Sequence, residues 1–208
     1  MQKKMFLFMS LLAFGIMSNS CNKEENEDND NNSSGSIIEK SVTLNAAGYD
    51  KWVYFSFKEG EVVEISDFSN SDDWDIAFHR MDVRVNCGTS GPGSGGTLDL
   101  GTVSFGSITE APETGYALND SIDIMESSAM PPAYVTVPGD TVLSGKWVTY
   151  THTESGAVYT VNDHVYIVKT ADGKYVKIWL KDYYNDEGNG GYPTMKYAYQ
   201  SDGSRQFN

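Results

Sequence analysis

The stretch "KWVTYTHTESGAVYTV" occupies residues 146–161 and predicts a β-hairpin. β-Branched and aromatic residues alternate with polar ones on both sides of a short polar turn at residues 153–156, a pattern typical of two antiparallel strands. His152 lies where the first strand meets the turn. The residues alone leave two interpretations of this histidine: a solvent-exposed turn residue, or a ligand for a metal or cofactor.

The same alternation recurs through residues 37–208 and predicts an all-β fold. Seven further segments carry it, namely "WVYFSF" (52–57), "EVVEI" (61–65), "WDIAFH" (74–79), "MDVRVN" (81–86), "HVYIVKT" (164–170), "KYVKIWL" (174–180) and "TMKYAYQ" (194–200). Turn candidates at residues 58–61, 153–156 and 171–174 join neighbouring segments, and Asp172-Gly173 is the strongest because that pair tolerates a tight hairpin. No helical apolar stripe is sustained anywhere. We therefore expect a single, mostly antiparallel domain.

Two stretches interrupt this β pattern. Residues 86–96, "NCGTSGPGSGG", lack the Lys-Ser/Thr ending of a phosphate-binding loop and precede no predicted helix, so we expect a flexible connection. Residues 123–140, "DIMESSAMPPAYVTVPGD", contain Met125 and Met130 in a polar, proline-rich setting. Pro131 favours an extended Met130 and excludes a helix there. Met130 either folds back onto the sheet or stays free for another role.

The first 20 residues predict a signal peptide. Lys3 and Lys4 precede the apolar run "MFLFMSLLAFGIM" (5–17), which is too short to span a bilayer comfortably, and "SNSC" follows it. Cleavage before Cys21 would produce a lipoprotein with lipid on the Cys21 thiol and an anchor in the membrane. A plain signal peptide followed by a chance cysteine is the alternative.

Residues 21–36 predict a disordered tether. From residue 22 to residue 36 there is no apolar side chain, so the segment cannot bury enough surface to offset the entropy of ordering. Its acidic run resembles the export signal of surface lipoproteins, and a simple spacer is the alternative. The remaining residues, 37–208, suffice for one domain.

Charge and composition exclude several classes of function. Removal of residues 1–20 would take away two lysines and no acidic residue, leaving 13 basic and 29 acidic side chains and a net charge of −16. This sign disfavours nucleic acid as a partner. With Cys21 carrying lipid, Cys87 would have no intrachain partner. No catalytic motif is present, His79 is expected in the core and His164 on a strand surface, so we expect no enzymatic activity.

Three blocks of sequence resemble the HmuY family of haem-binding lipoproteins from gram-negative anaerobes. They are "WDIAFHRMDVRVNCG" (74–88) with the glycines after it, "YIVKTADGKYVKIWLKDY" (166–183) and "MKYAY" (195–199). The resemblance covers roughly residues 41–199. It implies a hand-like all-β fold that grips haem (iron protoporphyrin IX) between protruding β-finger loops. It also implies a lipid-anchored place in the outer membrane, at the cell surface, with shedding as an open alternative.

The same resemblance implies two axial ligands for the haem iron. "WVTYTH" (147–152) matches the strand that ends in one ligand, which assigns that role to His152. Met130 takes the position of the other ligand, where the best-known members have histidine, and Met125 is the alternative in the same stretch. A His/Met site favours Fe(II) more than a bis-His site does, because thioether sulfur raises the reduction potential. An aromatic cleft would come from Tyr134, Trp147, Tyr150 and Tyr159.

Two functions from different classes remain. The first is a haemophore-like surface lipoprotein that takes haem, from host haemoproteins among other sources, and delivers it to an outer-membrane uptake receptor. The alternative is a β-sandwich surface module that binds glycan or protein without haem.

Overall fold

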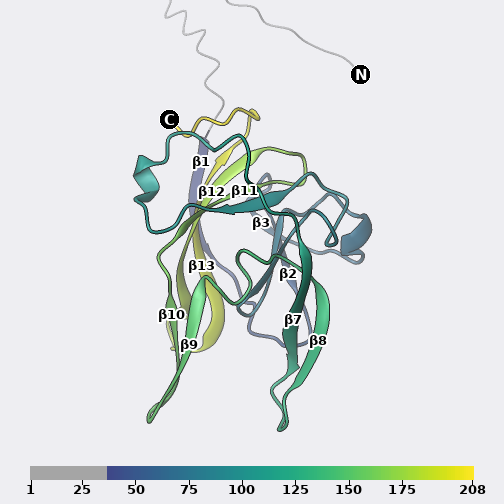
Figure 1. Cartoon of the computed structure of the whole chain (residues 1–208), viewed down its shortest axis with the longest axis vertical. Helices are drawn as coiled ribbons and strands as arrows, with labels where there is room; N and C mark the ends of the chain where they lie inside the picture. The colour runs from purple at the N-terminus through teal and green to yellow at the C-terminus, as the bar shows by residue number, and fades with distance from the viewer. Residues whose placement is uncertain (1–36) are drawn as a thin grey trace, which may run out of the picture. The chain divides into compact units, whose positions relative to one another are not determined.

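The computed structural model describes residues 37–208, and the signal peptide, Cys21 and tether predicted for residues 1–36 lie outside this range. Within it the chain forms antiparallel strands and two short 3-10 helices, as shown in Figure 1. The all-β, antiparallel, single-domain prediction is confirmed. Among the described residues, no helix has the length and apolar character needed to cross a membrane.

Two antiparallel sheets build the body of the domain. The five-stranded sheet has the order β1 (Ile37–Thr43), β13 (Gly190–Gln200), β12 (Tyr175–Tyr184), β11 (Val165–Lys169) and β6 (Gly96–Asp99). The four-stranded sheet has the order β3 (Glu61–Val63), β2 (Val53–Ser56), β4 (Ile76–His79) and β5 (Asp82–Val85). The 3-10 helices η1 (Phe68–Asn70) and η2 (Phe105–Ser107) lie in connecting segments.

Two separate hairpins extend from this body. The first pairs β7 (Asp120–Ser127) with β8 (Ala133–Gly139), and the second pairs β9 (Val148–Thr153) with β10 (Gly156–Val161). Figure 1 shows both hairpins projecting from the same end of the described domain, with the start of β1 and the C-terminus at the other end. This arrangement agrees with the hand-like shape expected from the family resemblance.

The main core lies between the two sheets. Phe55 of β2 and Phe78 of β4 belong to the same buried cluster as Ile178 of β12 and Tyr197 of β13. The rings of Phe55 and Tyr197 pack edge to face with centroids 5.8 Å apart, a favoured geometry for aromatic pairs. Burial of these large side chains lets the domain fold without a disulfide, since Cys87 is a buried free thiol.

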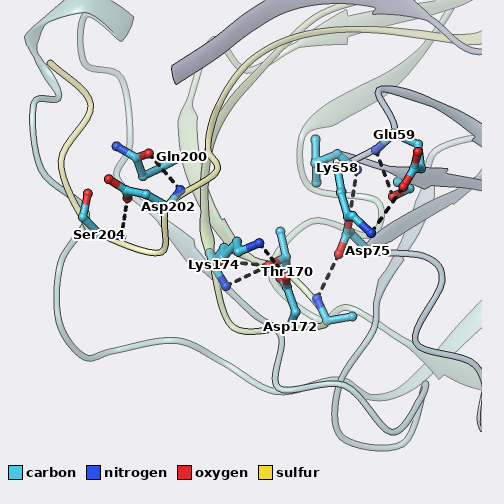
Figure 2. A network of polar contacts seen from close by, with 12 residues as sticks. Lys58, Glu59, Asp75, Thr170, Asp172, Lys174, Gln200, Asp202 and Ser204 are labelled. Carbon is cyan, nitrogen blue, oxygen red and sulfur yellow. Dashed lines mark hydrogen bonds and ion pairs between the residues drawn. The ribbon is translucent and has the colours of Figure 1, made fainter. Parts of the chain in front are cut away.

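A buried carboxylate, Asp75, ties the two sheets together. Its oxygens accept hydrogen bonds from the backbone N–H groups of Phe57, at 2.8 Å, and Ala171, at 2.9 Å. Ala171 lies in the turn between β11 and β12, and Figure 2 shows a dashed line from the Asp75 side chain to this turn, in which Thr170 and Asp172 are labelled. Burial raises the pKa of Asp75 to about 6, because desolvation penalises the charged form more than the two N–H groups favour it.

The nine strand segments predicted from sequence are all strands, and the three predicted turns all connect hairpin strands. The prediction that residues 123–140 interrupt the β structure was wrong, because they contain most of the β7–β8 hairpin. Both faces of this projecting hairpin are largely exposed, so its strands carry acidic and small residues and a weak hydrophobic pattern. Strands β1 and β6 were also not recognised in the sequence.

The glycine loop at residues 86–96 is closely packed, contrary to the flexible connection that its composition predicts. The Asn86 amide donates to the carbonyl oxygens of Ser71 and Trp74, at 2.8 and 2.9 Å, and accepts from the Gly93 N–H at 3.0 Å. A Cβ on Gly93 would lie 2.6 Å from the Asn86 carbonyl oxygen and 2.8 Å from Ala171 Cα. The glycines therefore permit a close approach between backbones.

Candidate ligand cleft between the two hairpins

A cavity of about 550 Å³ lies between the two hairpins and the β4–β5 turn. Its size is within the usual range for small-molecule sites. It is lined by Asp123, Met125 and Tyr134 of the first hairpin, by Tyr150, Ala157 and Tyr159 of the second, and by Tyr49, Arg80, Met81 and Asp82 at its floor. We call this cavity the finger cleft.

Asp140 fixes the chain between the two hairpins at their bases. One carboxylate oxygen accepts the backbone N–H groups of Val142 and Leu143, both at 2.8 Å, and the other accepts the Thr97 hydroxyl at 2.5 Å. The Asp140 N–H also donates to the Val83 carbonyl of β5 at 2.8 Å. These bonds secure the segment that leads from β8 to β9, and they hold the near end of each finger against the body.

A row of tyrosines forms one wall of the finger cleft. Tyr150 and Tyr159 are cross-strand neighbours with ring centroids 5.3 Å apart. The Tyr159 ring also packs against the ring of the fully buried Tyr183, with centroids 4.5 Å apart. Desolvation raises the pKa of Tyr159, and nearby Arg80 opposes that rise. Tyr150 is 51% exposed and Tyr134, on the facing hairpin, is 61% exposed. Their ring faces are therefore available to stack against a flat ligand.

Of the residues that the structure describes, Arg80 is the only cationic one that lines the finger cleft. Its guanidinium donates to the Ala47 carbonyl at 2.7 Å and lies 4.3 Å from the centroid of the Tyr49 ring. Among residues 37–208 it forms no ion pair with a carboxylate. Asp82 instead lies 3.7 Å from His79, so the guanidinium can still receive an acidic group of a ligand.

His152 lies on the cleft-facing side of β9, next to the lining residues. Side chains alternate along a strand, so His152 shares its face with Tyr150, which lines the cleft. Its cross-strand partner, Ala157, also lines the cleft. The imidazole is exposed, and its Nδ1 lies 3.4 Å from the Tyr150 hydroxyl oxygen. His152 therefore stands one step further toward the tip than the Tyr150–Tyr159 pair.

The two candidate methionines occupy different positions on the other hairpin. Met125 lies within the finger cleft, opposite Tyr134 in the β7–β8 register. Met130 lies in a bend at the tip, and its side chain is 90% exposed. The structure thus brings Met125 into the lining and leaves Met130 and His152 toward the tips of opposite hairpins.

One predicted lining residue lies elsewhere. Trp147 is fully buried in the main core at the base of β9, and its indole N–H donates to the Met81 carbonyl at 2.9 Å. The prediction for Trp147 was wrong because Trp147 precedes β9, where the chain still packs inside the body. Tyr134, Tyr150 and Tyr159 do line the cleft, as predicted.

The other histidines do not join this site. His79 is buried in the core and its Nε2 lies 3.0 Å from the Tyr49 carbonyl oxygen, which confirms its predicted packing role. His164 precedes β11 and contacts Asp99 at 2.9 Å. Within the described range, no group of three or more His, Cys, Asp or Glu side chains is placed to hold a metal ion.

The floor of the finger cleft was missed in the sequence. Arg80 belongs to the block "AFHRMD", and it adopts a left-handed backbone with φ of 55° in the β4–β5 turn. That conformation is uncommon for a residue other than glycine, and no sequence pattern predicts it here. Asp123 and Met125 stand two residues apart, a spacing that places them on one strand face once a strand is recognised there.

Comparisons with known proteins agree with this architecture. The sequence model of the family described as HmuY protein matches residues 48–197. No curated protein matches the chain. A solved structure from Bacteroides vulgatus, assigned as an HmuY-like haem-binding protein, is 25% identical, with 78% of this chain and 92% of that chain covered and a TM-score of 0.62.

Two further solved structures share the fold at lower identity. The apo HmuY analogue of Tannerella forsythia is 23% identical, with 81% of this chain and 98% of that chain covered and a TM-score of 0.61. A protein of Bacteroides fragilis assigned as a lipoprotein is 22% identical, with 81% and 91% covered and a TM-score of 0.62.

Proposed function

Because the chain belongs to the HmuY family, we propose that it binds haem in the finger cleft. The observation that carries this proposal is a cavity of about 550 Å³ with exposed tyrosine rings on both flanking hairpins and candidate iron ligands on each of them. The haem-binding assignment of its relative in Bacteroides vulgatus supports the same conclusion.

His152 and Met130 are the proposed axial ligands, with Met125 as the alternative to Met130. A methionine that is 90% exposed is unusual, because this side chain normally fills gaps in a core. Its thioether and the exposed imidazole of His152 stand on opposite hairpins, so each can approach one face of a flat ligand. Haem iron accepts imidazole nitrogen and thioether sulfur as axial ligands.

The rest of the finger cleft fits the periphery of a porphyrin. Tyr134, Tyr150 and Tyr159 offer ring faces for the macrocycle. Arg80 offers a guanidinium without a carboxylate partner among the described residues, suited to one of the two propionates. Asp82 and Asp123 also line the cleft, so the second propionate is best placed at its open side, in solvent.

The protein's biological role is the capture and transfer of haem, without catalysis. We assign its anchor to lipid on Cys21 and its place to the outer face of the outer membrane, and the solved relative assigned as a lipoprotein supports the lipid anchor. The hairpins lie at the opposite end of the domain from the start of β1, which is the end that follows the tether in sequence (Figure 1). From the outer face of the outer membrane, the protein would take haem from host haemoproteins and deliver it to an uptake receptor.

A spectroscopic titration tests haem binding. Purified protein is added to ferrous and to ferric haem, and the Soret band is followed against free haem. The proposal predicts a sharp, shifted band that saturates at one haem per chain, stronger for the ferrous form. An unshifted spectrum at stoichiometric haem would instead favour the second class of function, a surface module whose exposed tyrosines contact glycan or protein.

A further inference from the structure

A second cavity, of about 480 Å³, lies on the outer face of the five-stranded sheet and shares no residue with the finger cleft. We call it the back cavity. Among its lining residues, Glu39 of β1 and Lys177 of β12 lie in one row of the sheet, each paired with Ala198 of β13, and Lys196 and Trp179 are paired in a neighbouring row. The remaining lining residues are Val103, Ser104, Phe105, Gly106 and Phe207.

Lys177 is a buried cation in the back cavity. Only 4% of its surface is exposed, and its ammonium group donates to the Ile108 carbonyl at 2.9 Å. Within residues 37–208 no carboxylate forms an ion pair with it. Burial lowers the pKa of Lys177, and nearby Glu39 partly opposes that effect. A buried charge without a counter-ion is costly, so an anion beside Lys177 would be stabilised.

The charges of the back cavity sum to a single positive charge. Lys196 is paired with Glu39 at 2.5 Å, which leaves Lys177 as the unbalanced group. This local excess is opposite in sign to the chain as a whole, whose net charge is −14. A ligand with one negative charge, such as a carboxylate, would neutralise the cavity, whereas a dianionic phosphate would overcompensate it.

Aromatic side chains form the walls around these lysines. Phe105 lies under both ammonium groups, with Lys177 Nζ 4.4 Å and Lys196 Nζ 4.7 Å from its ring centroid, and Phe207 lies 5.2 Å from Lys177 Nζ. Trp179 adds a third ring, and its buried indole N–H has no hydrogen-bond partner among the described residues. These walls favour a flat apolar group on the ligand, and the unpartnered donor favours an acceptor over another donor.

From these features we propose that the back cavity binds a small aromatic carboxylate. The carboxylate lies against Lys177, and the ring packs between Phe105, Phe207 and Trp179. This site is independent of haem binding, because it shares no residue with the finger cleft.

Benzoate and its neutral analogue benzamide are the probes for this site. In the ¹⁵N-labelled protein, the indole resonance of Trp179 is identified by its loss in Trp179→Phe and is then followed during each titration. Benzoate should shift this resonance saturably, and benzamide at the same concentrations should not. Equal shifts from both probes, or no shift from benzoate, would overturn the proposal.

Of three informative substitutions, two should weaken benzoate binding and one should strengthen it. Lys177→Met keeps most of the apolar body of the side chain but removes the ammonium group and its charge, and it should weaken benzoate binding about tenfold or more. Lys196→Gln, at a less buried position, should weaken binding too, because Glu39 is then left unpaired beside the ligand. Glu39→Gln should strengthen binding, because it frees Lys196 for the carboxylate.

Lys58→Met is the matched control, since Lys58 is an exposed lysine outside the back cavity, and its affinity for benzoate should equal that of the wild type. Thermal unfolding confirms that each variant is folded. If Lys177→Met and Glu39→Gln both bind benzoate like the control, the back cavity is not the site and the proposal fails.

Discussion

Tyr159 lies directly opposite Tyr150 across the β9–β10 hairpin, and the centroids of the two rings are 5.3 Å apart. Tyr159 in turn packs against Tyr183, which is fully buried in the main core. The exposed ring in the finger cleft is therefore connected to the core through one intermediate ring. This contact limits the movement of the hairpin base and keeps the cleft wall in place for a ligand.

Substitution of these two tyrosines should separate ligand binding from stability. Tyr150→Ala should lower haem affinity about three- to tenfold through the lost stacking contact, and change the free energy of unfolding by less than about 1 kcal/mol. Tyr159→Ala should also destabilise the fold by about 2–4 kcal/mol, because it leaves a gap beside Tyr183 and Tyr184. Haem titration and urea unfolding measure the two effects. Equal destabilisation by both variants would contradict the expectation that Tyr159 supports the core and Tyr150 does not.

The two proposed axial ligands, His152 and Met130, should differ in their response to the iron oxidation state. His152→Ala should weaken the binding of both ferrous and ferric haem by more than about tenfold. Loss of a residue that only orients a metal ligand already costs about tenfold in metal affinity, and loss of the ligand itself should cost more. Met130→Ala should mainly affect ferrous haem, because thioether sulfur favours Fe(II). Soret and visible spectra of each variant, oxidised and reduced, report the loss.

Met125→Ala is the matched comparison for Met130→Ala, since Met125 is the methionine inside the finger cleft. If Met125→Ala abolishes the ferrous spectrum while Met130→Ala preserves it, the ligand is Met125. If none of the three substitutions changes the spectra, the axial assignment fails altogether.

Much of the fold could be predicted because its strands are half-buried. In β12, for example, "KYVKIWL" alternates and carries large apolar residues toward the core. The β7–β8 hairpin escaped recognition because neither of its faces is buried along most of its length, so Asp123 and Ser127 occur where a core strand would have apolar residues. Without a buried face, these two strands lack the periodic apolar pattern on which the prediction of strands depends.

The site could be predicted only in part for a related reason. Tyr150 and His152 lie on one face of β9, and Tyr159 is the cross-strand partner of Tyr150 on β10. The alternation within the hairpin sequence is enough to place these three residues together. Arg80 and Met81 come from a turn in the other sheet, and only the tertiary fold brings them beneath the hairpins. Trp147 was wrongly predicted to line the cleft. The alternating pattern of β9 does not show at which residue the strand leaves the body of the domain.

Asp75 should make stability depend on pH. Its pKa is raised from an ordinary value of 3.8 to about 6, so between these values the folded protein holds a proton that the unfolded chain releases. The contribution of this group to stability is therefore fully present below about pH 4 and falls as the pH rises through about 6, by up to about 3 kcal/mol. Urea unfolding between pH 4 and pH 7 measures it.

Asp75→Asn isolates this contribution from that of other groups. The amide cannot accept from both the Phe57 and Ala171 N–H groups, so the variant is destabilised, but it does not titrate. The stability advantage of the wild type over Asp75→Asn should therefore shrink as the pH rises from 4 to 7. A difference that is constant or grows over this range would contradict the raised pKa.

Cys21→Ser should release the protein from the membrane. The proposed anchor is lipid on the Cys21 thiol, which serine cannot replace in lipoprotein processing. Membrane fractions of cells that produce the wild type should contain the protein, and those that produce the variant should lose it to the periplasm or medium. Cys87→Ser, which alters a buried thiol of the folded domain, is the control and should leave the fractionation unchanged. Unchanged membrane partition of Cys21→Ser would count against the lipid anchor.

The most direct test of the central claim is to locate the iron in crystals of the protein grown with ferrous haem. Anomalous scattering at the iron edge gives its position independently of any assumption about the ligand. The proposed function predicts one iron per chain between the β7–β8 and β9–β10 hairpins, coordinated by His152 on one side and by a methionine sulfur on the other. An iron peak outside the finger cleft, or one inside it without His152 as a ligand, would contradict it.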